Sequence, residues 1–524
     1  MDQSVTMNMK PNPTSSSRAH ADADENFKGA VRELGRGGRT AILFGLAGQI
    51  IRFVMQVMLG RILGAQVYGI YTLGRSALEI LSRFGLIGLH NGVVHFIAIF
   101  NGEGDHARVR GTILTALALV AGTSSMAGIG LWWASEWIAS SGFDKPALAP
   151  ALRGFAVALP AYSTLLLLTS CARGLRHIGY YSGMTHMVHP LSVLLFVAGS
   201  FAIGMKLDGV LWGFGLSTAL ACVLMFVGLR RLFPSLLSFK EGFQFSASRI
   251  LPFSAKVLFK DLSSRILTHL DRLMLGILGV ASDVGIYGMS AFIGHRIDFF
   301  QRMFNSIFAP MIADLYHQGK HADMIRIFQT VSKWTLLLTL PVFFTFIFLG
   351  YAILELFGRE FHAGWPTLMI LSLGNLINVG VGPVGHMLIM TGRPGLELLN
   401  SWISGIANIV LNLWLIPRYG AFGAALATAI TVTMLNLIRL SEVYCIHQCH
   451  PFRLGTLKVL AAFVLAGGSM WQLADIYQFA LGGKVASMAG FLIMYVALLF
   501  CLGWDEEDQL VVRRLRRRFS RLRG

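Results

Sequence analysis

The sequence is poor in charged residues. Only 14% of its 524 residues are Asp, Glu, Lys or Arg, whereas a soluble domain carries about 25%. Mean hydropathy is +0.61. Apolar runs of about 20 residues, each long enough to cross a hydrocarbon core of about 30 Å, recur from Thr40 to Gly503. The composition excludes a soluble protein and predicts an all-α polytopic membrane protein.

Cysteine is also scarce, and its distribution excludes a disulfide framework. The five cysteines, an odd number, are Cys171, Cys222, Cys445, Cys449 and Cys501. Residues 445–450 contain two cysteines and two histidines, but their spacing is not that of an established zinc site. We therefore expect neither a bound metal nor a cofactor.

No nucleic-acid motif accompanies the formal net charge of +17. Many basic residues lie in short loops and at the C-terminus, where membrane topology and anionic lipid headgroups account for them. Residues 1–39 are polar and lack the apolar core of a secretory signal peptide. We expect contact with membrane lipids and none with nucleic acid.

The apolar runs predict about fourteen transmembrane helices. The expected ranges are 40–63, 68–89, 111–133, 151–172, 184–204, 209–229, 250–278, 284–315, 328–350, 366–391, 395–416, 421–444, 457–473 and 485–502. Lys and Arg gather in the loops on one side, which the positive-inside rule assigns to the cytoplasm together with the N-terminus. An even number of spans places the C-terminus there as well.

The two halves of the chain repeat a motif. The first copy is Met58-Leu59-Gly60 followed by Gly69-Ile70-Tyr71, and the second, at the same interval, is Met274-Leu275-Gly276 followed by Gly285-Ile286-Tyr287. Six helices per half predict a parallel repeat. The predicted domains are a disordered cytoplasmic tail (1–39), a six-helix bundle (40–230), a cytoplasmic linker (231–249), a second six-helix bundle (250–445), two extra C-terminal helices (446–503) and a basic cytoplasmic tail (504–524).

Charged residues concentrate in the hairpin that opens each half. A charge at membrane depth costs about 2.5–3.5 kcal/mol, so it normally faces a cavity or pairs with another. The cationic excess predicts a water-filled cleft that binds an anion such as phosphate or pyrophosphate. The candidate substrate contacts are Arg52, Arg75, Lys256, Lys260, Arg265, Arg296 and Arg302. The candidates for ion coupling or gating are Glu79, Asp261, Asp271, Asp298 and His295.

Some of these charges have a purely structural interpretation. Residues four apart on a helix can pair and hold it together. This applies to Asp261 with Arg265 and to Asp298 with Arg302. Arg52 has no acidic neighbour in the sequence, so it is the leading candidate for substrate contact.

Three segments resemble a known family. The run Leu63-Gly64, Tyr68-Gly69-Ile70-Tyr71 resembles the first hairpin of Wzx-type oligosaccharide flippases, as do Asp271–Gly276 and Gly285–Tyr287. Residues 417–425 are similar to the segment before that family's twelfth helix. Over about residues 40–503 the chain is similar to the polysaccharide transport branch of the multidrug/oligosaccharidyl-lipid/polysaccharide superfamily.

The resemblance implies a V-shaped pair of six-helix bundles that works by alternating access. It implies a flippase, not an enzyme, that moves an undecaprenyl-pyrophosphate-linked oligosaccharide from the cytoplasmic to the periplasmic leaflet of the bacterial inner membrane. Such a step serves the synthesis of O-antigen, capsule or exopolysaccharide. Glycosyltransferases on the inner side and a polymerase on the outer side are the partners expected for that role.

Three other functions are weighed against this one. A multidrug exporter of the same superfamily usually takes cations and has an acidic cleft, which the cationic excess here opposes. A polysaccharide polymerase or ligase tends to have a large outer loop, whereas the predicted outer loops are short. A structural scaffold would gain nothing from the insertion cost of so many charges.

Overall fold

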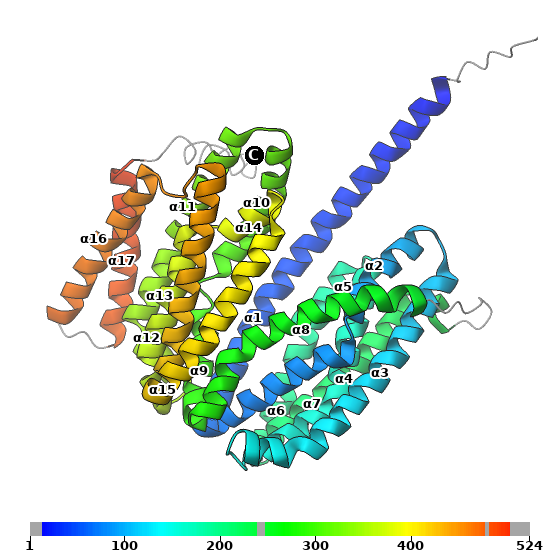
Figure 1. Ribbon diagram of the computed structural model, residues 1–524, viewed down its shortest axis with the longest axis horizontal. Helices are drawn as coiled ribbons and strands as arrows, with labels where there is room; N and C mark the ends of the chain where they lie inside the picture. The colour runs from blue at the N-terminus through cyan, green and yellow to red at the C-terminus, as the bar shows by residue number, and fades with distance from the viewer. Residues whose placement is uncertain (1–12, 238–246, 477–480, 504–524) are drawn as a thin grey trace, which may run out of the picture. The chain divides into compact units, whose positions relative to one another are not determined.

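The computed structural model describes residues 13–237, 247–476 and 481–503, and every regular element in these ranges is a helix (Figure 1). The α-helices are α1 (Pro13–Leu86), α2 (Leu89–Gly102), α3 (His106–Trp137), α4 (Leu148–Gly174), α5 (Ile178–Gly183), α6 (His189–Ala202), α7 (Leu207–Leu232), α8 (Ala247–Leu278), α9 (Ala281–Gly294), α10 (Phe299–His317), α11 (His321–Phe348), α12 (Gly350–Glu355), α13 (Trp365–Val381), α14 (Val384–Met390), α15 (Pro394–His447), α16 (Leu454–Ile476) and α17 (Leu481–Cys501). Residues 1–12 of the predicted tail, 238–246 of the predicted linker and the basic tail 504–524 lie outside the described residues.

Ten helical stretches among the described residues are long and apolar enough to cross a membrane. Two of them, Leu43–Leu86 and Pro394–His447, each cover two of the predicted spans. Each has a glycine with a non-helical backbone: Gly64 at φ 69° and ψ 174°, and Gly420 at φ 52° and ψ −129°. Glycine has no Cβ and tolerates such angles, so each long helix is kinked there. The all-α membrane fold is confirmed, and the total of fourteen spans stays a prediction.

The helix expected over residues 284–315 is not continuous. α9 ends at Gly294 and α10 begins at Phe299. In the turn between them, backbone N–H groups bond to carbonyl oxygens three residues back, at 2.9–3.2 Å. Such bonds tighten a helix end and interrupt the α-helical ladder. The span predicted over 284–315 is therefore two helices, and His295 and Asp298 lie in the turn that separates them.

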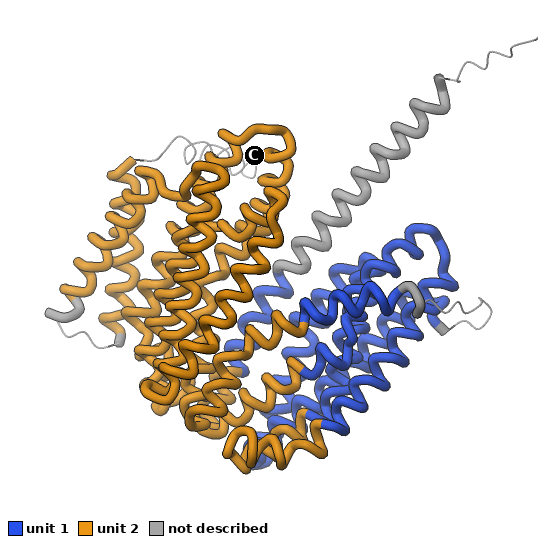
Figure 2. Tube along the Cα trace, viewed as in Figure 1, with its two compact units in different colours: residues 1–55, 81–130, 156–261 blue, residues 56–80, 131–155, 262–524 orange. Residues whose placement is uncertain are grey.

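Two compact units make up the structure (Figure 2). Unit 1 comprises residues 1–55, 81–130 and 156–261, and unit 2 comprises residues 56–80, 131–155 and 262–524. The core of unit 1 contains Leu89, Val93 and Ile97 of α2, Ile113 of α3 and Met225 of α7. The domain boundaries proposed from the sequence stay a prediction.

The last two long helices, α16 and α17, pack on α11 within unit 2. The rings of Phe344 in α11 and Phe491 in α17 stack with centroids 4.0 Å apart. Ala462 and Ala466 of α16 are fully buried in the same core. Figure 1 shows α16 and α17 side by side. They occupy the part of the chain, 446–503, that was expected to hold two helices outside the repeat.

The two copies of the repeated motif meet inside unit 2. The interval of 216 residues that separates Gly69 from Gly285 also separates Ala65 from Ala281. A Cβ on Gly69 would lie 1.8 Å from the carbonyl oxygen of Ala281, and a Cβ on Gly285 would lie 2.0 Å from that of Ala65. Such reciprocity, in which each copy presents the same atoms to the other, is the signature of a two-fold axis.

Two charged side chains bind helix ends beside this junction. The Glu360 carboxylate accepts a hydrogen bond of 2.7 Å from the backbone N–H of Ala65, just after the kink in α1. The Lys145 ammonium donates to two carbonyl oxygens at the C-terminal end of α8, at 2.6 and 2.8 Å. Burial lowers the pKa of Lys145, and Asp144 opposes that shift. Each charge has the sign that the helix dipole favours.

Candidate functional site

Four side chains in unit 2 form a charged group centred on Glu79, which we name the Glu79 cluster. Glu79 Oε1 lies 3.1 Å from Nε of Arg75, which is four residues earlier on α1. Glu79 Oε2 lies 3.6 Å from Nη1 of Arg265 and 3.2 Å from Nε2 of His269, both on α8. Spacings of four residues place Arg75 with Glu79, and Arg265 with His269, on single helix faces.

The Glu79 cluster carries more positive than negative charge. One carboxylate lies against two guanidinium groups, so the net charge is +1 even when His269 is neutral. The side chains of Arg75 and Arg265 are 26% and 38% exposed, whereas His269 is only 4% exposed. Arginine binds phosphate oxygens through two parallel hydrogen bonds. The cluster can therefore accept an anion on its exposed side.

Three cationic candidates lie in unit 1 instead. Lys256 and Lys260 on α8 are exposed and make no ion pair among the described residues. Asp261 is bound to two residues of α2: its Oδ2 lies 2.9 Å from Nε2 of His90 and 3.3 Å from Nδ2 of Asn91. Asp261 and Arg265, expected as a possible pair on α8, thus each have a partner on another helix.

Arg52, the third cationic candidate in unit 1, is partly buried beside His186. A Cβ on Gly48 would lie only 2.1 Å from the backbone oxygen of His186, so α1 passes very close to that residue. Arg52 is one turn further along α1 and interacts electrostatically with His186. No carboxylate pairs with Arg52 in the described part of the chain. This agrees with the lack of acidic neighbours seen in the sequence.

Asp271 is held by three neutral donors in unit 2. Its Oδ1 accepts a hydrogen bond of 2.8 Å from the amide of Asn412. Its Oδ2 accepts bonds of 2.7 Å from the hydroxyls of Tyr287 and Thr428. The carboxylate thereby joins α8, α9 and α15. A role for Asp271 in ion coupling or gating stays a prediction.

The candidates near the break between α9 and α10 interact mostly with one another. The guanidinium carbon of Arg296 lies 4.5 Å from the ring centroid of Phe292. Arg302 donates a hydrogen bond of 3.1 Å to the backbone oxygen of His295, whose Nδ1 lies 3.9 Å from Asp298 Oδ2. All four side chains are candidates from the sequence, Arg296 and Arg302 for substrate contact and His295 and Asp298 for ion coupling or gating.

Sequence reasoning missed His269 and the donors around Asp271. A single histidine on a membrane-spanning helix is usually a core residue, and so His269 drew no attention. The available signal was its position, four residues after Arg265 and therefore on the same face of α8. Asn412 and Thr428 are more than 140 residues from Asp271 along the chain, and only folding brings them to it.

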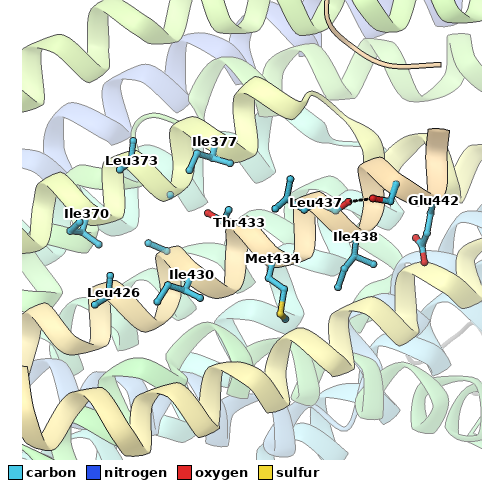
Figure 3. Close-up of a pocket in the computed structure, with 13 residues that line it drawn as sticks. Ile370, Leu373, Ile377, Leu426, Ile430, Thr433, Met434, Leu437, Ile438 and Glu442 are labelled. Atoms are coloured by element: carbon cyan, nitrogen blue, oxygen red, sulfur yellow. Dashed lines mark hydrogen bonds between the residues drawn. The ribbon is translucent and has the colours of Figure 1, made fainter. Parts of the chain in front are cut away.

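A groove of about 730 Å³ lies between α13 and the second half of α15 (Figure 3). Its walls are Ile370, Leu373 and Ile377 on α13 and mainly apolar residues of α15, and Glu442 lies at one end. Among the described residues that line the groove, none is cationic. Among the described residues, no group of three or more His, Cys, Asp or Glu is placed to hold a metal ion.

A family model matches more than half of the chain. The family is described as polysaccharide biosynthesis protein, and its model covers residues 34–315. That range includes α8 and the whole Glu79 cluster.

Two relatives share sequence with part of the chain. The capsular polysaccharide biosynthesis protein CapF of Staphylococcus aureus is 25% identical over 182 residues, which are 34% of this chain and 45% of the relative. The probable low-salt glycan biosynthesis flippase Agl15 of Haloferax volcanii is 25% identical over 170 residues, 32% of this chain and 36% of the relative. The chain thus matches less than half the length of either.

Solved structures show the same fold. The lipid II flippase MurJ, in an inward closed conformation, superposes with a TM-score of 0.66 at 14% identity, over 87% of this chain and 98% of its own. An inward-facing multidrug resistance MATE family transporter of the MOP superfamily superposes at 0.63 and 12% identity, over 76% and 94%. At these identities the likeness concerns the fold alone, and it fits flippases and multidrug transporters equally.

Proposed function

Because the chain belongs to the polysaccharide biosynthesis protein family, we propose that it is a flippase for a polyprenyl-pyrophosphate-linked oligosaccharide. The cargo moves from the cytoplasmic to the periplasmic leaflet of the bacterial inner membrane, and both termini of the chain are cytoplasmic. The step supplies the synthesis of a cell-surface polysaccharide. Glycosyltransferases and a polymerase act before and after it.

The Glu79 cluster is the observation that carries this proposal. A lipid-linked oligosaccharide has an apolar tail that stays in the bilayer and a pyrophosphate that must leave water during transfer. Two partly exposed arginines against one carboxylate offer that pyrophosphate charge-assisted hydrogen bonds. A multidrug exporter that takes cations would be opposed by the same charges.

The test is transport in proteoliposomes. Purified protein is reconstituted with a fluorescent undecaprenyl-pyrophosphate oligosaccharide, and an added quencher reports which leaflet the label occupies. Wild type is expected to exchange the label between leaflets. Arg265→Gln is expected to slow it about tenfold or more, because a lost charge-assisted hydrogen bond costs about 1.5–3 kcal/mol.

Arg153→Gln is the matched control. Arg153 also pairs with a glutamate, Glu136, but on the exposed surface of unit 2. Its loss should leave the rate unchanged, because exposed pairs contribute little. A wild type that moves an organic cation but not the lipid would replace the flippase proposal with that of a multidrug exporter.

A further inference from the structure

We propose that the groove between α13 and the second half of α15 binds phosphatidylethanolamine, with an acyl chain along its walls and the headgroup ammonium at Glu442. None of the residues that line this groove belongs to the Glu79 cluster. The inference therefore goes beyond the proposed function and assigns a separate lipid site to unit 2.

The walls of the groove suit a hydrocarbon chain. On α15, Ile430, Met434 and Ile438 follow one another at intervals of four residues, so they form one apolar ridge that leads to Glu442 (Figure 3). Leu437 beside this ridge is 53% exposed. A cleft that holds water would need polar walls, whereas these walls are mainly apolar. The chain of a lipid is therefore the occupant that fits them.

Glu442 gives the groove a negative charge at one end. Its Oε2 accepts a hydrogen bond of 2.6 Å from the amide of Asn400. Arg439, three residues earlier on α15, pairs with Glu397 instead. In the part of the chain that the structure describes, no Lys, Arg or His pairs with Glu442. A charge in a membrane-spanning helix normally pairs with another charge, and a neutral amide does not balance it. A cationic group on the ligand would.

The position of Glu442 favours a membrane lipid as that ligand. The span predicted over 421–444 ends two residues after Glu442, so we expect its carboxylate at the depth of the lipid headgroups. From there the groove follows α15 back to Leu426, a length of about 24 Å at 1.5 Å per residue. One phospholipid chain crosses about half of a hydrocarbon core of about 30 Å. The groove is therefore long enough for a whole chain, with the headgroup at the charged end.

The chemistry of the headgroup distinguishes phosphatidylethanolamine from other phospholipids. Its primary ammonium has N–H donors, and hydrogen bonds between ionised groups are about twice as strong as neutral ones. Phosphatidylcholine has the same charges but no N–H, and phosphatidylglycerol has no cation at all. With identical acyl chains, the three lipids differ only in what they offer to Glu442.

The experiment is native mass spectrometry of the full chain, titrated with these three lipids carrying the same two acyl chains. For wild type we expect phosphatidylethanolamine to bind about tenfold more tightly than either of the others. Glu442→Gln keeps the size of the side chain and an acceptor for Asn400. It should bind phosphatidylethanolamine about tenfold more weakly, so that the three lipids become equal.

Glu355→Gln is the matched control, because Glu355 is an exposed glutamate of unit 2 at the end of α12 and does not line the groove. It should keep the wild-type order of affinities. Equal affinities in wild type would mean that the groove takes any bilayer lipid, and would overturn the inference. A preference for phosphatidylethanolamine that persists in Glu442→Gln would overturn it as well.

A second measurement needs no variant to fold. Phosphatidylethanolamine with a photoactivatable diazirine in one acyl chain is cross-linked to wild type, and the labelled peptides are identified. We expect the label on α13 and the second half of α15, and we expect excess phosphatidylethanolamine to remove it better than excess phosphatidylcholine. Label spread evenly over the spans would contradict the inference. Neither measurement involves the pyrophosphate or transport, so the proposed function is tested separately.

Discussion

At the level of single residues, the proposed function predicts that the charge of Glu79 controls how firmly Arg75 and Arg265 hold a phosphate. Glu79→Gln keeps the size of the side chain and removes the competing negative charge. We expect a farnesyl-pyrophosphate-linked sugar, as a soluble probe, to bind about tenfold tighter, a change of about 1.4 kcal/mol. Transport should slow, because the headgroup is released less readily.

The control for this variant is Glu136→Gln, since Glu136 pairs with Arg153 on the exposed surface of unit 2. It should change neither binding nor transport. Weaker binding of the probe by Glu79→Gln would mean that the carboxylate orders the arginines for the ligand and does not compete with it.

Asp271 contributes to stability through the three hydrogen bonds that its carboxylate accepts. Asp271→Ala leaves two buried groups, the Tyr287 hydroxyl and the Asn412 amide, without that acceptor. Each buried donor left unsatisfied costs about 1–3 kcal/mol. We expect a clearly lower Tm in detergent, measured by differential scanning fluorimetry.

Thr433→Ala is the matched control for stability, since Thr433 lies on α15 in the apolar groove and makes no hydrogen bond among the described residues. Its Tm should stay near that of wild type. Equal Tm values for the two variants would show that the Asp271 hydrogen bonds do not stabilise the fold.

At the level of helices, the reciprocal glycine contact requires that neither repeat copy carry a side chain there. Gly69→Ala and Gly285→Ala each place a methyl group within 2.0 Å of a backbone oxygen. Overpacking of this kind costs about 1–3 kcal/mol. Because the contact is symmetric, we expect both variants to lower the Tm by similar amounts.

The comparison variant for the glycines is Gly122→Ala, at a mid-helix position of α3 with open space around it. Alanine should stabilise the helix there by up to about 1 kcal/mol. A fall in Tm for only one of Gly69→Ala and Gly285→Ala would contradict a two-fold junction.

The helices were largely predictable, and so were the breaks at Gly64 and Gly420, whereas the break between α9 and α10 was not. An apolar run of about 20 residues identifies a span. The run predicted over residues 328–350 corresponds to α11, His321–Phe348. The breaks depend on the backbone of single residues. Gly64 and Gly420 interrupt long helices by their non-helical angles, while many other glycines in the chain lie inside regular helices. The predicted spans stop at 63 and 416 and resume at 68 and 421, so the sequence placed both breaks, whereas it did not mark the break after Gly294 within the span predicted over 284–315.

The Glu79 cluster was predictable only in part. Charge at membrane depth drew attention to Arg75, Glu79 and Arg265, because its cost demands a reason, and the structure brings the three side chains together. Their meeting depends on how α1 and α8 pack, which helix periodicity does not reveal. His269 escaped because its partner in the cluster, Glu79, lies on another helix.

At the level of the whole molecule, the predicted topology places particular residues on the cytoplasmic or on the outer side of the membrane. Cys445 and Cys501 are exposed and are expected on the cytoplasmic side. A membrane-impermeant maleimide should therefore label neither in intact cells and both after permeabilisation. A cysteine introduced as Lys206→Cys, in an exposed loop predicted to face outward, should react in intact cells. The opposite pattern would invert the orientation of the chain and the direction of transport.

The most direct test of the central claim, that the Glu79 cluster binds the pyrophosphate headgroup, is photo-cross-linking from Ser264. This exposed residue is next to Arg265 on α8, and a benzoyl-phenylalanine there would lie beside the bound headgroup. With an undecaprenyl-pyrophosphate oligosaccharide radiolabelled in its first sugar, we expect label on the protein from position 264 and none from Ser140, an exposed residue in the π-helical turn after α3. The label should disappear in the Arg75→Gln, Arg265→Gln double variant. Equal labelling from both positions, or labelling that survives the loss of both arginines, would contradict the account.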